Sequence, residues 1–262
     1  MNVLLTGGFS GIGKATKELF LKNGHTVYVF DNKKIEKEDN LFPFCVDITD
    51  KEELIRIKKD LENKCVSFDV IINIAGIHKM ISLVESDYAL IKKLIDINLT
   101  GTMLINHTFH SLLKEKGRIV IVTSEVATFD PMPFNGLYNV SKTALETYAQ
   151  ALRQELNLLN QKVITIRPGA VETPLSNNSI TDTESLSKET KLYKRQSKKF
   201  VSIMKKFMGK PIKPEKISKL IYKSVIKKHP RITYSKHKNI GLILLNILPK
   251  RLQCFIIKLL LK

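Results

Sequence analysis

Tyr138 and Lys142 are the residues of this sequence best suited to acid–base chemistry. They stand four positions apart in YNVSK, and the following TALETYAQALRQELNLL has apolar residues at helical spacing. Residues four apart on a helix project side by side, so the Lys142 ammonium can lie close to the Tyr138 phenol. A nearby positive charge lowers the pKa of a tyrosine below its usual value of about 10. We therefore predict that Tyr138 is a general acid/base, although in a lysine-rich chain the pair alone could also be a solvated helix pair.

Ser124 is the second candidate, because it ends the strand-like run RIVIVTS. A hydroxyl at that position could form a hydrogen bond with a substrate carbonyl. The end of this strand and the start of the Tyr138 helix are then expected to meet at one site.

A glycine-rich turn near the N-terminus is expected to bind a phosphate group. The apolar run NVLLT precedes GGFSGIG, and the helical pattern KATKELFLKNG follows it. A turn between a strand and a helix offers unpaired backbone N–H groups and the positive end of a helix dipole. Gly7 would permit the tight turn, Gly11 the approach of a pyrophosphate, and Gly13 the close packing of helix on strand.

Asp31 ends the next strand-like run, HTVYVF, about 20 residues after the glycines. An acidic side chain there can accept hydrogen bonds from a ribose diol and would repel a 2′-phosphate. The sequence therefore favours NAD as the cofactor. NADP stays open, because Lys33 and Lys34 follow at once.

The remaining segments alternate between strand and helix patterns. LFPFCVDITD reads as a strand that turns at Asp47, KEELIRIKKDLENK as a helix, and FDVIINIAGI as a buried strand containing Asn73. A long helix is predicted over residues 86–113, where Asn98 among apolar neighbours reads as a satisfied core amide. RIVIVTS, the Tyr138 helix and KVITIRPGAVET complete the series. The pattern predicts an α/β fold, a Rossmann-type doubly wound parallel sheet with ligands at the carboxyl ends of its strands.

Length and cysteine usage indicate one domain without metal or disulfides. The 262 residues fit a single domain, with a cofactor-binding and catalytic core over 1–174, a substrate lid over 175–213, and a helix, strand and apolar basic tail over 214–262. Cys45, Cys65 and Cys254 lie far apart and not at ligand spacing. The chain begins directly on a strand pattern, so we expect a cytoplasmic protein, with peripheral attachment to a membrane as an open alternative.

Positive charge gathers in the C-terminal part. Of the 43 Lys and Arg residues, 22 lie between positions 188 and 262, where the only acids are Glu189 and Glu215. The tail HKNIGLILLNILPKRLQCFIIKLLLK is apolar but broken at Pro249, and its segments are too short to cross a bilayer. It could form two short helices packed on the domain or on a partner subunit, or it could lie in the interface of an anionic membrane. Packing is favoured, because exposed apolar tails lower solubility.

Taken together, the motifs resemble those of the short-chain dehydrogenase/reductase family. They occur in the family's order as TGGFSGIG, Asp31, VDITD, NIAG, Asn98, Ser124, YNVSK and RPGAVET, and they cover residues 2–173. NIAG replaces the commoner Asn-Asn-Ala-Gly, and Arg167 stands where a small or polar residue is more usual. Neither departure removes a catalytic group.

The resemblance implies a catalytic tetrad and a set of cofactor contacts. Ser124 would hold the substrate oxygen, Tyr138 would transfer the proton, and Lys142 would bind the nicotinamide ribose and lower the tyrosine pKa. Asn98 would order a water that relays protons, which replaces its interpretation as a core amide. The implied cofactor contacts are Thr6, Gly7, Ser10, Gly11, Ile12, Gly13, Asp31, Asp47, Ile48, Asn73, Ala75, Gly76, Tyr138, Lys142, Pro168, Gly169, Val171 and Thr173.

The activity implied by the resemblance is NAD(P)-dependent interconversion of a secondary alcohol and a ketone. The 14-residue separation of Ser124 and Tyr138, with FDPMPFNG between them, is similar to that of family members acting on retinoids, steroids and other lipophilic alcohols. A homodimer or homotetramer is expected by the same likeness. One alternative is a 3-oxoacyl-[acyl-carrier-protein] reductase, because an acidic carrier protein would suit the basic C-terminal part. A non-enzymatic alternative is a dinucleotide-sensing protein whose basic tail binds a membrane or nucleic acid, a reading that the intact tetrad disfavours.

Overall fold

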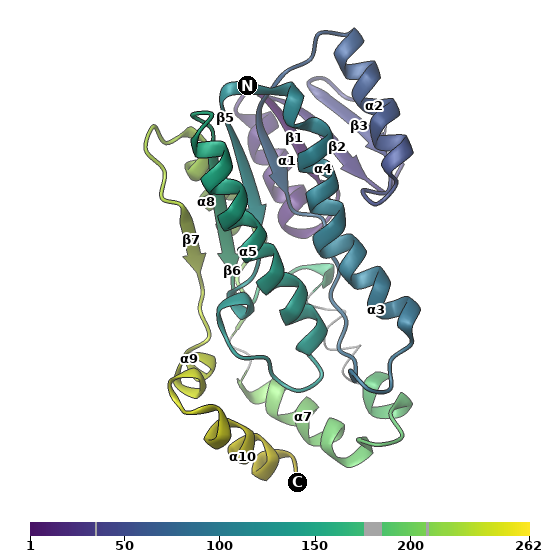
Figure 1. Cartoon of the computed structure of the whole chain (residues 1–262), viewed down its shortest axis with the longest axis vertical. Helices are drawn as coiled ribbons and strands as arrows, with labels where there is room; N and C mark the ends of the chain where they lie inside the picture. Colours follow the sequence, from purple (N-terminus) through teal and green to yellow (C-terminus); the bar gives the residue numbers. More distant parts are fainter. Residues whose placement is uncertain (35, 176–184, 208–209) are drawn as a thin grey trace.

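A parallel sheet of seven strands forms the centre of the protein in a computed structural model, which describes residues 1–34, 36–175, 185–207 and 210–262. The strand order is β3-β2-β1-β4-β5-β6-β7, as the predicted doubly wound topology requires (Figure 1). The strands are β1 Asn2–Thr6, β2 Thr26–Asp31, β3 Leu41–Cys45, β4 Phe68–Asn73, β5 Leu113–Val122, β6 Lys162–Pro168 and β7 Thr233–Lys236.

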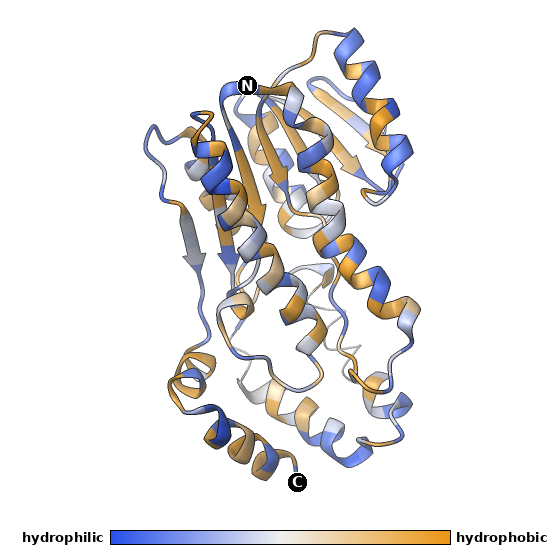
Figure 2. Cartoon of the chain, viewed as in Figure 1, coloured by the Kyte–Doolittle hydropathy of each residue, from blue (hydrophilic) through white to orange (hydrophobic). Residues whose placement is uncertain are grey.

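Helices cover both faces of this sheet. On one face α1 and α8 pack through Phe20, Ile217 and Ile221. On the other face α2, α4 and α5 pack through residues such as Leu54, Phe109 and Leu145, so the β-strands are apolar on both sides (Figure 2). The helices are α1 Gly11–Lys22, α2 Lys51–Asn63, α3 Tyr88–Ile95, α4 Gly101–Phe109, α5 Gly136–Asn157, α7 Lys194–Phe207, α8 Pro214–Ile226, α9 Ile240–Ile247 and α10 Lys250–Leu261.

The long helix predicted over residues 86–113 is interrupted in the structure. Between α3 and α4 the five residues Asp96–Thr100 form a π-helical turn, and strand β5 already begins at Leu113. This wider turn orients the Asn98 side chain toward the main chain of Ile77. The Asn98 amide accepts from the Ile77 N–H and donates to the Ile77 carbonyl. β5 starts early because Leu113 pairs with Phe68, ahead of a register shift in β4. Both features depend on partners distant in sequence, which periodicity does not show.

The C-terminal helices lie below the carboxyl ends of the strands (Figure 1). Pro249 separates α9 from α10, as the sequence predicts. The sequence favoured packing for this tail, but few of its apolar side chains are fully buried. Helix α9 has no buried residue, and α10 buries the apolar Leu261 and the polar Gln253. Within the described residues, no helix combines the length and apolar character needed to span a membrane.

The segment predicted as a lid is described only in part. Residues 176–184 and 208–209 lie outside the described residues. Of the remainder, the N–H groups of Lys191 and Leu192 donate to the Glu85 carboxylate at 2.8 and 3.0 Å. Helix α7 follows and lies below the carboxyl ends of the strands (Figure 1).

Candidate active site

A cavity of about 880 Å³ lies at the carboxyl ends of the strands. It extends from the glycine turn before α1, past the ends of β2 and β4, to the start of α5 and the C-terminal helices. Most of the residues predicted from the sequence line it: Gly7, Ser10, Gly11, Ile12, Asp31, Asp47, Ile48, Ala75, Gly76, Ser124, Tyr138, Lys142, Pro168, Gly169, Val171 and Thr173. Thr6, Gly13, Asn73 and Asn98 do not.

The glycine turn has the geometry that the sequence predicted. Gly7 has a φ of +71°, and a Cβ there would lie 2.9 Å from the Cα of Ala75. A Cβ on Gly13 would lie 1.8 Å from the carbonyl oxygen of Gly7, so only glycine lets α1 start this close to β1. Helix α1 begins at Gly11 without a side-chain cap from Ser10 and without an acidic residue in its first turn. This end of the cavity fits a phosphate group.

Asp31 lines the cavity beyond the glycine turn. Its carboxylate accepts hydrogen bonds from the backbone N–H of Phe9 at 3.1 Å and of Lys33 at 3.3 Å. The Phe9 bond ties the end of β2 to the glycine turn itself. Asp47 accepts from the N–H and the hydroxyl of Thr49 at 2.8 and 2.7 Å, which fixes the turn that carries Ile48.

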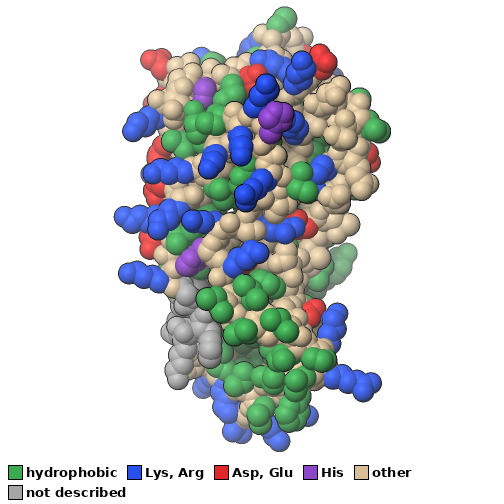
Figure 3. All heavy atoms as spheres, turned by 90° about the vertical axis from the view of Figure 1, so that its left-hand side faces the viewer, with side chains coloured by type: hydrophobic (Ala, Val, Ile, Leu, Met, Phe, Trp, Pro, Cys, Tyr) green, Lys and Arg blue, Asp and Glu red, His purple; other side chains and the backbone are tan. Residues whose placement is uncertain are grey.

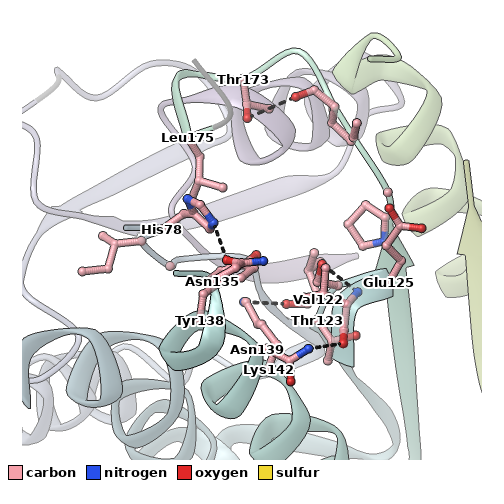
Figure 4. A pocket seen from close by; sticks show the side chains of 18 of the residues that line it. His78, Val122, Thr123, Glu125, Asn135, Tyr138, Asn139, Lys142, Thr173 and Leu175 are labelled. Atoms are coloured by element: carbon pink, nitrogen blue, oxygen red, sulfur yellow. Dashed lines mark hydrogen bonds between the residues drawn. The ribbon is translucent and has the colours of Figure 1, made fainter. Parts of the chain in front are cut away.

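Ser124 and Tyr138 meet at the centre of the cavity, where β5 ends and α5 begins. Both side chains are less than a tenth exposed, and the Ser124 hydroxyl lies near enough to the Tyr138 phenol to affect its pKa. The Tyr138 ring also packs edge-on against His78, with centroids 4.5 Å apart. Figure 4 shows Tyr138 beside His78 and Asn135. The side chains of His78 and Asn135 form a hydrogen bond of 2.9 Å with each other.

The pKa of Tyr138 differs from the prediction. Burial raises the pKa of Tyr138 to about 12, and the interaction with the Ser124 hydroxyl acts in the opposite direction. Burial outweighs the lowering expected from Lys142, whose Nζ lies 5.8 Å from the ring centroid. In the protein alone, Tyr138 is therefore a neutral phenol at neutral pH.

Lys142 is buried beneath the tyrosine, with 4% of its surface exposed. Its Nζ donates to the carbonyl oxygen of Val122 at 3.3 Å (Figure 4). Desolvation lowers the pKa of Lys142 to about 8. The group thus lies at the cavity wall with a charge that titrates near neutral pH.

Three predicted residues support the wall from behind. The Thr6 hydroxyl accepts from the N–H groups of Ile74 and Ala75, at 3.1 and 3.2 Å. Asn98 accepts from the Ile77 N–H at 2.8 Å and donates to the Ile77 carbonyl at 2.9 Å. Asn73 points away from the cavity and donates to Asn106 at 2.8 Å, while its own Oδ1 is buried without a hydrogen bond.

These contacts bear on two predicted roles. Asn98 also donates to the Ser141 hydroxyl at 3.1 Å and is fully buried, which matches the satisfied core amide first read from the sequence. Its role in a proton relay stays a prediction. Asn73 was expected to line the cofactor channel, but its side chain is turned into the core by its bond to helix α4, so the lining there comes from Ala75 and Gly76.

Sequence reasoning missed several polar residues of the cavity. Glu125 directly follows Ser124 and accepts from the backbone N–H of Asn239 at 2.7 Å. Burial raises the pKa of the Glu125 carboxyl. Asn139, inside the YNVSK motif, donates to the carbonyls of Val126 and Phe129 at 2.6 and 3.0 Å. Their positions next to Ser124 and Tyr138 were the available signal.

The far end of the cavity is apolar and comes from segments distant in sequence. Its wall comes from α7, from α9 and α10, and from the loops near β4 and β5. The apolar lining residues there are Met80, Phe129, Met132, Phe200, Ile203, Met204, Ile240, Leu242, Leu245 and Leu260. Within the part of the chain that the structure describes, no group of His, Cys, Asp and Glu residues could hold a metal ion.

Comparison with known proteins gives relatives over most of the chain. The family model for short chain dehydrogenases matches residues 1–184. A short-chain dehydrogenase of Hypocrea virens is 28% identical over 183 residues, 68% of this chain but only 64% of the relative, so less than two thirds of that relative is matched. An NADPH-dependent 1-acyldihydroxyacetone phosphate reductase of Schizosaccharomyces pombe is 32% identical over 73% of this chain and 67% of its own length. A 3-ketodihydrosphingosine reductase of Bacteroides thetaiotaomicron is 25% identical over 87% and 84%.

Solved structures are similar over a larger share of the chain. A short chain dehydrogenase family protein from Francisella tularensis has 26% sequence identity and a TM-score of 0.72, over 89% of this chain and 96% of that one. The structure of ElxO with NADP bound has 25% identity and a TM-score of 0.71 over the same shares.

Proposed function

Because this chain belongs to the short-chain dehydrogenase family, we propose that it is an oxidoreductase that interconverts a ketone and a secondary alcohol with a nicotinamide dinucleotide. The observation that carries this proposal is that Ser124 and Tyr138 stand together in one cavity, both nearly buried, above the buried amine of Lys142. The pair lies in the same cavity as the glycine turn. The glycine turn proposed to bind phosphate and the proposed acid–base group, Tyr138, therefore line the same cavity.

The proposed roles follow from the atoms that face the cavity. When bound, the nicotinamide ring supplies or accepts the hydride. In the reducing direction the Ser124 hydroxyl forms a hydrogen bond with the carbonyl oxygen, and Tyr138 gives that oxygen its proton. A pKa of about 12 keeps the Tyr138 proton in place at neutral pH, so the resting protein is prepared for reduction. Lys142 would hold the ribose next to the nicotinamide.

The residues along the cavity fit a dinucleotide. The uncapped start of α1 and the left-handed Gly7 offer N–H groups to a pyrophosphate. Asp31 at the end of β2 can accept hydrogen bonds from a ribose diol, which supports NAD as the preferred cofactor. Direct measurement of the two Michaelis constants, for NADH and NADPH, tests this preference.

A lipophilic substrate is proposed because the space beyond Tyr138 is apolar. Large apolar pockets hold ligands by burying their surface, with few polar groups to orient them. Two relatives are named as reductases of 1-acyldihydroxyacetone phosphate and 3-ketodihydrosphingosine, both ketones that carry a long chain. We propose a ketone on a chain or ring system of this kind. Assembly into a homodimer or homotetramer stays a prediction.

The test is a reductase assay with the purified protein. NADH or NADPH is incubated with long-chain keto lipids, ketosteroids and retinal, and loss of the reduced-nicotinamide absorbance is followed. A 3-oxoacyl thioester on acyl carrier protein belongs in the same panel, because the basic C-terminal part suits an acidic carrier. Turnover of that thioester far above the others, with NADPH preferred, would favour the carrier-protein reductase.

Tyr138→Phe is expected to lower kcat by about a thousandfold or more, because it removes the proton donor while leaving the cavity shape. Tyr148→Phe is the matched control, since Tyr148 lies on the same helix and its hydroxyl accepts from Asn106 outside the cavity. Cofactor affinity should be similar in both variants. Full turnover by Tyr138→Phe would refute the assignment of the acid–base group.

A further inference from the structure

The outward sides of α9 and α10 expose many apolar side chains. We call them the C-terminal apolar face: Ile240, Leu244, Ile247, Leu252, Phe255, Leu259 and Leu260, with exposed fractions from 43% at Leu252 to 73% at Ile240 and Ile247. In Figure 3 these hydrophobic side chains gather at the lower end of the molecule, over α9 and α10. A contiguous patch of this kind on a protein surface marks an interaction site.

Basic side chains surround this face. Lys238, Lys250, Arg251, Lys258 and Lys262 are all exposed on or beside the two helices. The sequence contains no acidic residue between positions 216 and 262. Lys250 is paired with Asp130 at 3.6 Å, at the edge of the face. The face is thus apolar in its middle and cationic at its rim, the composition of helices that lie in the interface of an anionic bilayer.

The active-site cavity opens onto the same face. Ile240 and Leu260 line the cavity and are also 73% and 50% exposed, so they stand at its mouth. Leu242 and Leu245 continue the apolar lining inward along α9. An apolar molecule could pass from this face to Tyr138 along a continuous apolar path.

We propose that the C-terminal apolar face docks on an anionic lipid bilayer and that a lipophilic substrate enters the cavity from the acyl-chain region, between Ile240 and Leu260. The proposed docking depends only on the exposed residues of this face, whereas the proposed entry of substrate rests on the proposed function. A bilayer fits better than a second copy of this chain. A symmetric dimer through the face would bring each cationic rim toward another, and like charges that approach each other are destabilising.

The sequence contains no tryptophan, so one introduced tryptophan reports on its own surroundings. Phe255→Trp places the reporter on the apolar face, and Leu158→Trp places an 83% exposed control after the end of α5. With vesicles of phosphatidylcholine and phosphatidylglycerol, Phe255→Trp should shift its emission to the blue and be quenched by brominated acyl chains. Leu158→Trp should do neither. Phosphatidylcholine vesicles alone, or high salt, should give much weaker binding.

Two further variants separate the apolar and electrostatic contributions. Leu244→Asp with Ile247→Asp should abolish partitioning of the Phe255→Trp protein, and Arg251→Glu with Lys258→Glu should weaken it by roughly tenfold or more. All four side chains are exposed, so the fold should persist, as circular dichroism would check. Absence of vesicle binding would overturn the proposal. So would a blue shift that appears without lipid and follows protein concentration, because that result identifies a second copy as the occupant. Neither readout needs turnover, so failure of the docking and failure of the proposed reaction are distinguishable.

Discussion

Among the residues of this site, Lys142 has a charge that depends unusually closely on pH, because its amine is buried. Lys142 is 4% exposed, and its hydrogen bond is to the carbonyl of Val122 rather than to a carboxylate. Without a negative partner, desolvation favours the neutral amine and lowers the pKa of Lys142 to about 8. A small rise in pH therefore removes a charge that a solvated lysine would keep.

We predict that cofactor affinity falls as pH rises through about 8. Above this pH the Lys142 amine is neutral and no longer offers a positive charge to the ligand. The dissociation constant, measured by titration of the reduced cofactor's fluorescence across that range, should increase. Lys142→Met should bind more weakly at every pH and without the inflection. An equal inflection in this variant would assign the titration to a different group.

The directions in which the pKa values of Tyr138 and Lys142 shift could not be predicted from the sequence. YNVSK indicates that Tyr138 and Lys142 share a helix face, and both do line the cavity. It does not show how deeply they are buried, and burial determines that the tyrosine pKa rises to about 12. Spacing along a helix is local information, whereas desolvation depends on every element that packs around the pair.

Among the elements, the junction of β1 and α1 depends most on a single residue. A Cβ on Gly13 would overlap the carbonyl oxygen of Gly7, at 1.8 Å, and lie 3.2 Å from the Cα of Gly8. Both are backbone atoms, which cannot rotate away as a side chain could. Any side chain at this position must move the start of the helix away from the strand.

Gly13→Ala should lower the free energy of unfolding by about 1–3 kcal/mol, the usual effect of overpacking, and should weaken cofactor binding because the turn shifts. Lys22→Ala at the exposed end of the same helix is the control and should change stability by less than about 0.5 kcal/mol. Urea unfolding followed by circular dichroism measures both. Equal stability of Gly13→Ala and the native protein would contradict the described packing.

At this scale the sequence predicted the strands and their parallel arrangement well. Glycine turns and alternating strand and helix patterns are local signals, and all seven strands occur where these patterns lie. The π-helical turn over Asp96–Thr100 and the early start of β5 at Leu113 were not predicted. Each results from a contact with a distant partner, Ile77 and Phe68 respectively.

At the scale of the whole molecule, hydrogen bonds to one loop help to hold the C-terminal helices beneath the sheet. Helix α9 has no fully buried residue, and its Leu242, Ile243 and Leu245 are half-buried. Hydrogen bonds to the loop after Ser124 add to this partial packing. Glu125 accepts from the Asn239 N–H at 2.7 Å, and the Asp130 N–H donates to the Asn246 side chain at 2.6 Å. The apolar tail gave no sign of these contacts in the sequence.

We predict that Glu125→Ala loosens α9. Loss of the acceptor for the Asn239 N–H removes a bond to a buried carboxylate, worth about 1–3 kcal/mol, so amide exchange over residues 239–247 should accelerate by roughly tenfold. Glu125→Gln retains an amide oxygen as acceptor and should stay close to the native rates. Hydrogen–deuterium exchange with mass spectrometry measures this, with β1 as an unaffected reference. Unchanged exchange in Glu125→Ala would assign the position of α9 to other contacts.

The attachment through one loop also limits how substrate range could be redesigned. Gln253 donates to the Asp130 carboxylate at 3.1 Å, so both α9 and α10 are tied to the segment 125–130. A chimera that receives only a relative's C-terminal helices would leave these acceptors facing foreign side chains. The loop and the two helices therefore form one structural unit. A graft that transfers the loop together with the helices should keep the geometry of the cavity wall, whereas a graft of the helices alone should lose it.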